Sequence, residues 1–182
     1  SVLDLAAFDP ASFGEQLAAV ARAGFRLASL AELGDTPEHR RRLYELNVET
    51  ARDIPGSSGQ TEPFEEYARG YFERESYRPD GQWLALDEAG QWAGLSLLAW
   101  DPQRRTVLHE MTGVRRAYRG RGLALPMKVM ALTCAQTWSA THALTHNDSL
   151  NAPMLAVNHR LGYQRRPGFF KMYCYDLERE VS

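Results

Sequence analysis

The feature that most constrains the fold is a run of three strand patterns that only short turns separate. These patterns are QWLALD (82–87), QWAGLSLLAW (91–100) and RTVLHEMTGV (105–114). The intervening EAG and DPQ segments are typical of tight turns. Because strands joined by tight turns pair antiparallel, the run predicts three neighbouring antiparallel strands in one sheet.

Apolar residues at helical spacing flank this run on both sides, and Gly and Pro mark where each element stops. Helices are expected over 11–23, from Pro37 until Pro55, over 64–77, from about Gly122 to Ala140 and over 151–162, and strands over 25–30, 142–146 and 169–177. This order predicts an α/β (α+β) fold with a mixed, mostly antiparallel central sheet of about six to seven strands and helices on both faces. Residues 1–24 lie outside the order and are expected to form an N-terminal extension or linker with a short helix, ahead of one domain over 25–182.

The bulk composition argues against several classes of protein. A chain of 182 residues fits one domain, and its formal net charge of −2 lacks the basic excess of a typical nucleic-acid-binding domain. Its longest apolar run, Leu95 to Trp100, is too short to cross a membrane, and no signal peptide is visible. Cys134 and Cys174 form no metal-binding or disulfide pattern, so a cytoplasmic protein without a metal is expected.

The segment GVRRAYRGRGLALPMKVM (113–130) carries the main functional signal. In it a strand ends, a short basic loop follows, and a helix begins. Backbone N–H groups at a helix start have no partner within the helix, and together with the helix dipole they bind anions. Gly120 and Gly122 would let a phosphate approach the backbone closely, and Arg119 and Arg121 would add positive charge beside it. The segment therefore predicts a phosphate-binding loop.

The spacing of the loop residues decides between phosphate-binding patterns. The dinucleotide fingerprint needs a third glycine where Leu125 stands, and the P-loop ending GK[ST] is absent. RGRGLA instead matches the pattern Arg/Gln-x-x-Gly-x-Gly/Ala through Arg119, Gly122 and Ala124. In these residues the sequence resembles the GNAT superfamily of N-acetyltransferases. On its own, RGRG is also compatible with a solvated strand-to-helix turn that binds nothing.

Three further features strengthen the resemblance. Val114 lies five residues before Arg119, as in the VxPxYRGxG segment of the family. The segment THNDSLNAPMLAVNHRLGY (145–163) resembles the family's second signature, in which a strand ends in Asn, Asn recurs near the start of a helix, and Leu-Gly-aromatic closes that helix. The residues in these places are Asn147, Asn151, Met154 and Leu161–Gly162–Tyr163. The predicted order of elements is also the family's, and the resemblance covers roughly residues 25 to 177.

The resemblance implies that acetyl-CoA, or a close acyl-CoA, is the co-substrate and that no metal takes part. The pantetheine arm would enter the gap between the strand that ends at Val114 and the strand over 142–146, and the pyrophosphate would sit on the loop amides. The residues implied for cofactor binding are Thr112, Gly113, Val114, Arg119, Gly120, Arg121, Gly122, Leu123, Ala124, Asn147, Asn151 and Asn158.

Glu110 is the candidate general base for direct transfer of the acyl group to an amine. An amine resembling that of lysine has a pKa of about 10.4, so only roughly one molecule in a thousand is neutral at pH 7 and a base is needed. Glu110 precedes Val114 by four residues, which places both on one face of a regular strand. The alternative is a salt-bridged or solvated carboxylate. His109 is expected to face the opposite side and to be structural.

Asn158 is a departure from the family pattern. It stands where many members carry a tyrosine that acts as general acid. Asparagine can bind the thiol or the pantetheine, but it cannot protonate a thiolate efficiently. Tyr163 or Tyr173 would then supply the proton, or the thiolate would leave unassisted. Glu110 and Asn158 are thus the predicted catalytic residues.

The sequence therefore predicts an N-acetyltransferase that acts on a small, unidentified amine acceptor. A non-catalytic acyl-CoA-binding domain is the alternative, because SVLDLAAFDP (1–10) resembles the closing strand and linker of a preceding domain in tandem GNAT chains. A sister domain and a homodimer both stay open as partners. Nucleic-acid binding through RRAYRGR (115–121) is a third and weaker interpretation, so neither nucleic acid nor a membrane is an expected partner.

Overall fold

A computed structural model describes residues 1–55 and 60–166, and the predicted final strand over 169–177 lies outside these residues. The strands are Val2–Asp4 (β1), Arg26–Ser29 (β2), Tyr77–Leu86 (β3), Trp92–Asp101 (β4), Thr106–Val114 (β5) and His142–Thr145 (β6). The α-helices are Gly14–Arg22 (α1), Leu30–Leu33 (α2), Pro37–Ala51 (α3), Phe64–Phe72 (α4), Ala124–Thr137 (α5) and Ala152–Arg160 (α6), and the short 3-10 helices are Pro10–Phe13 (η1) and Arg116–Tyr118 (η2).

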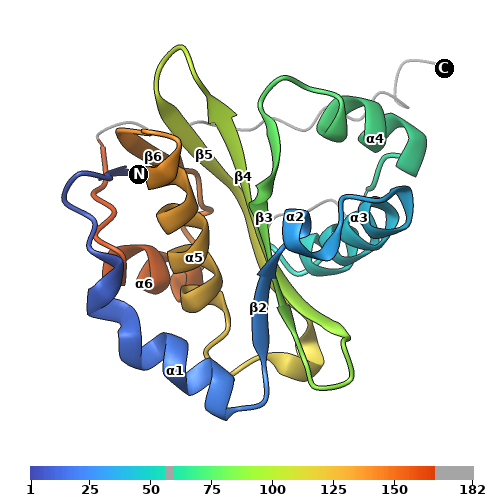
Figure 1. Cartoon of the computed structure of the whole chain (residues 1–182), viewed down its shortest axis with the longest axis horizontal. Helices are drawn as coiled ribbons and strands as arrows, with labels where there is room; N and C mark the ends of the chain where they lie inside the picture. The colour runs from blue at the N-terminus through green and yellow to red at the C-terminus, as the bar shows by residue number, and fades with distance from the viewer. Residues whose placement is uncertain (56–59, 167–182) are drawn as a thin grey trace, which may run out of the picture.

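The strands form one six-stranded sheet in the order β1-β6-β5-β4-β3-β2 (Figure 1). β5 and β6 pair in parallel, and the other neighbouring strands pair antiparallel. The predicted mixed, mostly antiparallel sheet is confirmed. The three strands expected from the central run of the sequence, β3 to β5, are adjacent in the sheet.

The turn between β3 and β4 follows from its local sequence. The carboxylate of Asp87 accepts hydrogen bonds from the backbone amides of Ala89, at 3.0 Å, and Gln91, at 2.8 Å. Gly90 supplies the positive φ of +75° that the reversal requires. The strand that follows is buried along its whole length except at Asp101, which explains its nearly continuous apolar sequence.

The structure differs from the prediction at the start of β3. The helix expected over 64–77 ends at Phe72, and β3 begins at Tyr77, before the PDG segment. PDG favours a turn locally, but tertiary contacts override this preference. Gly81 lies against Trp138 so closely that a Cβ would come within 2.6 Å of the indole ring. The strand therefore passes through this segment with a register shift in its ladder to β4.

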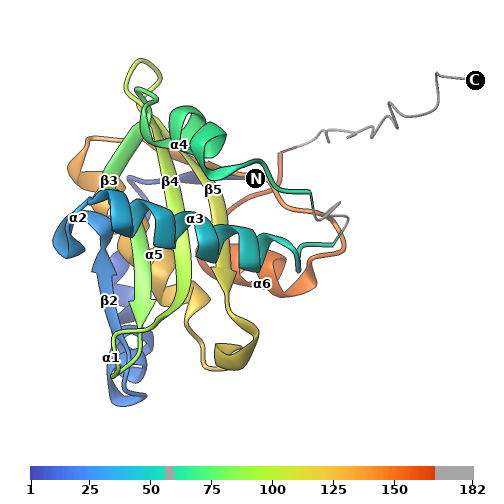
Figure 2. The same ribbon diagram turned by 90° about the vertical axis from the view of Figure 1, so that its right-hand side faces the viewer.

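Helices cover both faces of the sheet, as predicted (Figures 1 and 2). α1, α5 and α6 lie on one face, and α2, α3 and α4 lie on the other. Side chains of β4 alternate between the two cores, since Leu95 and Leu97 pack towards α3 and α4 whereas Leu98 and Trp100 pack towards α5. Within the described residues, no helix combines the length and apolar character needed to span a membrane.

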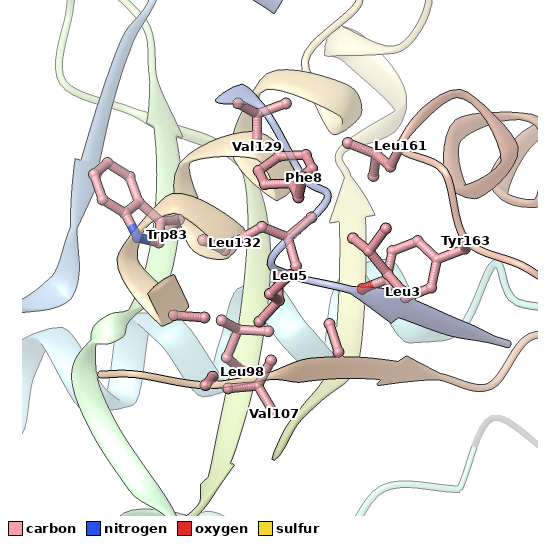
Figure 3. Close-up of a cluster of buried hydrophobic side chains, with 14 of the residues drawn as sticks. Leu3, Leu5, Phe8, Trp83, Leu98, Val107, Val129, Leu132, Leu161 and Tyr163 are labelled. Carbon is pink, nitrogen blue, oxygen red and sulfur yellow. The ribbon is translucent and has the colours of Figure 1, made fainter. Parts of the chain in front are cut away.

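The N-terminal segment belongs to the sheet and to the core. β1 forms the edge of the sheet by pairing with β6. The side chains of Leu3, Leu5 and Phe8 are 5%, 1% and 5% exposed and pack in one cluster with α5 (Figure 3). The predicted short helix is present as α1. The division into an extension over 1–24 and a domain over 25–182 stays a prediction.

Candidate active site

A cavity of about 700 Å³ opens where β5 ends and α5 begins. Its walls come from the end of β5, the loop from η2 to α5, the end of α3, one side of α1, and α6. The predicted cofactor residues that line it are Thr112, Gly113, Val114, Arg119, Gly120, Arg121, Gly122, Leu123, Ala124 and Asn151. Asn147 and Asn158 do not line it. The structure therefore brings the two sequence signatures, 113–130 and 145–163, to one cavity.

The loop between β5 and α5 presents backbone amides to this cavity. Gly120 and Gly122 have φ of +76° and +75°, and each has open space where a Cβ would stand. The residue at the N-cap of α5, Leu123, makes no side-chain hydrogen bond to the first helical turn. α5 begins at Ala124, slightly later than the predicted start at Gly122. The first amides of α5 are therefore available to an anion, which the helix dipole also favours.

Asp53, just beyond α3, binds two arginines of the segment between β5 and α5, of which Arg119 lines the cavity. Its carboxylate accepts hydrogen bonds from Arg116, whose Nε lies 3.1 Å away, and from Arg119. The hydrogen bonds from Arg116 and then Arg119 lower the pKa of Asp53 from 3.8 to about 2. Arg119 also donates from Nε to the carbonyl oxygen of Val114 at 3.0 Å. Sequence reasoning missed Asp53, because only the packing of α3 brings it to the loop.

The end of α3 sits directly over β5, and glycine makes this approach possible. A Cβ at Gly113 would lie 2.4 Å from Oγ1 of Thr50, and a Cβ at Gly94, in β4, would lie 2.8 Å from the carbonyl oxygen of Gly113. Thr50 lines the cavity, and its hydroxyl donates to the carbonyl oxygen of Leu46 at 2.8 Å. Gly113 therefore lets the end of α3 approach β5 at the cavity, whereas Gly94 allows close contact of β4 with β5 and with Met127 of α5.

A β-bulge in β5 changes the face on which Glu110 lies. The ladder between β4 and β5 shifts register at this point, which makes Glu110 an extra residue on β5. Val114 packs with residues at the start of α5, whereas the carboxylate of Glu110 accepts two hydrogen bonds from Arg74, which follows α4 on the other face. The expectation that Glu110 and Val114 share a face is therefore wrong, because a bulge breaks the alternation of side chains. Glu110 does not line the cavity, and its role as base stays a prediction.

A buried polar network lies on the α5 side of the sheet and ends at the cavity wall. His109 faces this side, opposite to Glu110 as predicted, and its Nε2 lies 2.8 Å from the hydroxyl of Ser96. Its Nδ1 lies 3.1 Å from the hydroxyl of Tyr163, and Ser96 lies 3.2 Å from the hydroxyl of Thr112, which lines the cavity. Desolvation by burial, and then the charge of Lys128, hold the pKa of His109 well below its usual range.

Lys128, in the second turn of α5, is a buried lysine in this core. Its side chain is 1% exposed, so almost none of it reaches solvent. Its Nζ lies 5.5 Å from the centre of the Tyr163 ring. Burial alone lowers the pKa of Lys128 from 10.5 to about 7. This burial was not expected, because lysine is almost never fully buried in folded proteins.

Of the three predicted asparagines, Asn151 caps α6, and Asn158 joins the last turns of α6 to Asn147 in the preceding loop. The Oδ1 of Asn151 accepts a hydrogen bond from the amide of Met154 at 3.3 Å and thereby caps the helix. Asn158 is 3% exposed and donates from Nδ2 to the Oδ1 of Asn147, while its own Oδ1 has no partner among the described residues. Burial raises the pKa of Tyr163, one of the two tyrosines considered as proton donors, and Tyr173 lies outside the described residues.

The fold of this chain is similar to that of solved acetyltransferases, among them a GCN5-related N-acetyltransferase. No family model matches the chain, and no curated protein matches its sequence. The likeness to known proteins therefore lies in solved structures.

Three solved structures illustrate the likeness. A GCN5-related N-acetyltransferase from Sphaerobacter thermophilus aligns with a TM-score of 0.58 and 21% identity over 76% of this chain, which is only 41% of the length of that protein. The NatC complex bound to Gag peptide and CoA aligns with a TM-score of 0.63 and 19% identity, over 85% of this chain and 91% of that one. YncA from Salmonella typhimurium, solved with its cofactor acetyl-CoA, aligns with a TM-score of 0.56 and 19% identity, over 76% and 77% of the two chains.

Proposed function

We propose that this chain transfers an acetyl group from acetyl-CoA to the amine of a small acceptor. One observation carries the proposal: a single cavity joins the uncapped start of α5, with its two open glycines, to the end of β5. The start of α5 suits a pyrophosphate. The end of β5 suits an extended arm that pairs with strand backbone. CoA has both parts, and the solved relatives with CoA or acetyl-CoA share this fold.

In this proposal the chain's residues divide the work between binding and chemistry. The amides of Gly120 to Ala124 bind the pyrophosphate, and the backbone of Thr112 to Val114 binds the pantetheine arm and orients the thioester. A strand amide beside the thioester stabilises the oxyanion that forms when the amine attacks. The thiolate, with a pKa of about 8.5 for an alkyl thiol, leaves without a proton from Asn158.

Glu110 is the proposed base, acting directly or through a water molecule on the acceptor amine. Its side chain is 21% exposed and that of Arg74 is 27% exposed, so the pair is partly accessible from the α4 side of the sheet. The guanidinium fixes the carboxylate at the bulge, next to the strand backbone where the thioester is expected. An acceptor would therefore approach from the side of α3 and α4, opposite to α5.

A non-catalytic acyl-CoA-binding domain is the second candidate, and one observation favours it. Neither predicted catalytic residue, Glu110 or Asn158, lines the cavity, and each is engaged by another side chain. The two candidates differ in turnover. Release of thiol from acetyl-CoA in the presence of a panel of amines would establish the enzyme, whereas CoA binding without turnover across the panel would favour the binding domain.

The CoA site itself is tested by thermal unfolding. Acetyl-CoA should raise the Tm, because a ligand that binds only the native state stabilises it. Gly122→Glu should abolish the shift, since its carboxylate would occupy the phosphate position. Gly90→Glu is a matched control, because Gly90 also has a positive φ and open space but lies in the turn between β3 and β4. An undiminished shift in Gly122→Glu would place the phosphates elsewhere.

A further inference from the structure

The buried polar network on the α5 side of the sheet reaches the cavity through Thr112. Ser96 is fully buried, and its hydroxyl lies 2.8 Å from Nε2 of His109 and 3.2 Å from the hydroxyl of Thr112. Nδ1 of His109 lies 3.1 Å from the hydroxyl of Tyr163. Thr112 is only half-buried and lines the cavity. One unbroken chain of hydrogen bonds therefore runs from the core to the cavity wall.

The direction of this chain follows from the state of His109. Desolvation by burial, and then the charge of Lys128, hold the pKa of His109 well below its usual range, so its ring is neutral, with one nitrogen that donates and one that accepts. If Tyr163 donates to Nδ1, then Nε2 donates to Ser96 and Ser96 donates to Thr112. In the opposite direction the phenolic hydrogen of Tyr163 would need another acceptor, although that side chain is only 6% exposed. Because a buried donor without an acceptor is unfavourable, the first direction is favoured.

The first direction leaves the hydroxyl hydrogen of Thr112 for a ligand in the cavity. The oxygen of Thr112 accepts from Ser96, which fixes the hydroxyl group in the wall. Of the β5 residues that line the cavity, Thr112 lies farthest along the strand from the phosphate loop, and Val114 lies nearest to it. A pantetheine arm that starts at the pyrophosphate and runs back along β5 therefore ends, with its sulfur, beside Thr112.

We propose that the hydroxyl of Thr112 donates a hydrogen bond to the sulfur of CoA as the thiolate leaves, with Ser96 and His109 as positioning residues. The inference rests on the proposed function, which places the arm along the end of β5. When the carbon–sulfur bond breaks, the electron pair stays on sulfur. The hydroxyl stabilises this charge and keeps its own proton, since hydrogen bonds to charged groups are the stronger ones.

The test is the pKa of the CoA thiol in the complex, measured by the ultraviolet absorbance of the thiolate. Thr112→Val should raise this pKa by about one to two units, the shift that corresponds to one lost hydrogen bond to a charged group. Thr112→Ser keeps the hydroxyl and should stay close to the wild type. Thr106→Val is a matched control in the same strand and should leave the thiol pKa unchanged, because the hydroxyl of Thr106 donates to the carbonyl oxygen of Arg104 and Thr106 does not line the cavity.

Ser96→Ala separates positioning from direct contact with the ligand. It removes the donor to Thr112 but leaves the hydroxyl of Thr112 in place, so it should raise the thiol pKa by less than Thr112→Val does. If Ser96 acts only through Thr112, the double variant should match Thr112→Val alone. Desulfo-CoA, which lacks the sulfur, should bind the wild type and Thr112→Val with the same Kd.

The direction of the chain can be measured without any ligand. Nitrogen NMR of the imidazole should find His109 neutral, with its hydrogen on Nε2. A hydrogen on Nδ1 would reverse the chain and direct the hydrogen of Thr112 into the core, which would overturn the inference even if Thr112→Val did not fold.

Failure of this inference is distinguishable from failure of the proposed function. A wild-type protein that does not bind CoA would contradict the proposed function itself. CoA binding with the same thiol pKa in the wild type and Thr112→Val would overturn the role of Thr112 and leave the proposed function intact. If Thr112→Val weakens desulfo-CoA as much as CoA, the side chain contacts the arm and the assignment to the sulfur is wrong.

Discussion

Replacing Lys128 by methionine should stabilise the fold at neutral pH, because the native state buries this amine in the core. Lys128 is 1% exposed, and burial lowers its pKa from 10.5 to about 7. Between these two values the unfolded chain binds more protons than the native state, so stability rises with pH across this window. Below about pH 7 the ammonium is charged in both states and the full cost of burying it applies.

The magnitude follows from the two pKa values. At pH 8 the unfolded lysine titrates about 2.5 units above the solution pH, and at about 1.36 kcal/mol per unit folding around Lys128 costs about 3 kcal/mol. Methionine has a similar length and adapts to irregular cores, so Lys128→Met should recover most of this free energy. For a domain of this size that corresponds to a rise in Tm of roughly 6–12 °C.

The measurement is urea unfolding of the wild type and Lys128→Met at several pH values from 6 to 11. The gap in unfolding free energy should be largest at or below pH 7, smaller at pH 9, and near zero above about pH 10.5. A gap that does not change with pH would mean that packing rather than charge causes it. A wild type that is more stable than the variant at pH 8 would refute the reasoning, since the ammonium would then have a stabilising partner.

Three further predictions concern the site and the sheet edge. Glu110→Gln should lower turnover roughly 10²–10⁴-fold at pH 7 with CoA affinity unchanged, and this loss of turnover should shrink at high pH, where the acceptor amine is already neutral. Wild-type turnover of the variant at pH 7 would exclude Glu110 as the base. Asp53→Asn should tighten CoA binding, measured by calorimetry between pH 5 and 9, because it removes a charged carboxylate and frees Arg116 and Arg119 for the phosphates. Weaker binding would show that Asp53 serves mainly to position these arginines. Leu5→Ala should lower the free energy of unfolding, measured by urea denaturation, by about 2–5 kcal/mol, as expected for a 1% exposed core leucine. A loss below about 1 kcal/mol would mean that β1 detaches readily.

The sequence was most informative where function and fold depend on neighbouring residues. The loop over 115–124 could be predicted because its glycines, its arginines and the helix start that binds anions are contiguous. Asn151 was singled out through the resemblance of 145–163 to the second family signature, and its capping of α6 is a finding of the structure. The central antiparallel strands followed from short turns whose residues fix their geometry.

The parts that were missed depend on contacts between distant segments. The bulge at Glu110 leaves no mark in a regular strand pattern, so its face was assigned wrongly. Asp53 reaches the cavity only because α3 packs against β5. β1 was not expected in this sheet, since residues 1–10 were compared with the closing strand of a preceding domain and their partner β6 lies far along the chain.

The pairing of β1 has a consequence for the order of events during folding. The amino group of Ser1 donates to the carbonyl oxygen of Thr145 at 2.8 Å, a contact between residues 144 positions apart. Contacts this remote in sequence form slowly, because a long loop must close first. At a synthesis rate of about 5–20 residues per second, β1 emerges on the order of ten seconds before β6 exists. For that time Leu3, Leu5 and Phe8 have no core to enter, so the nascent chain must keep this segment from binding other chains.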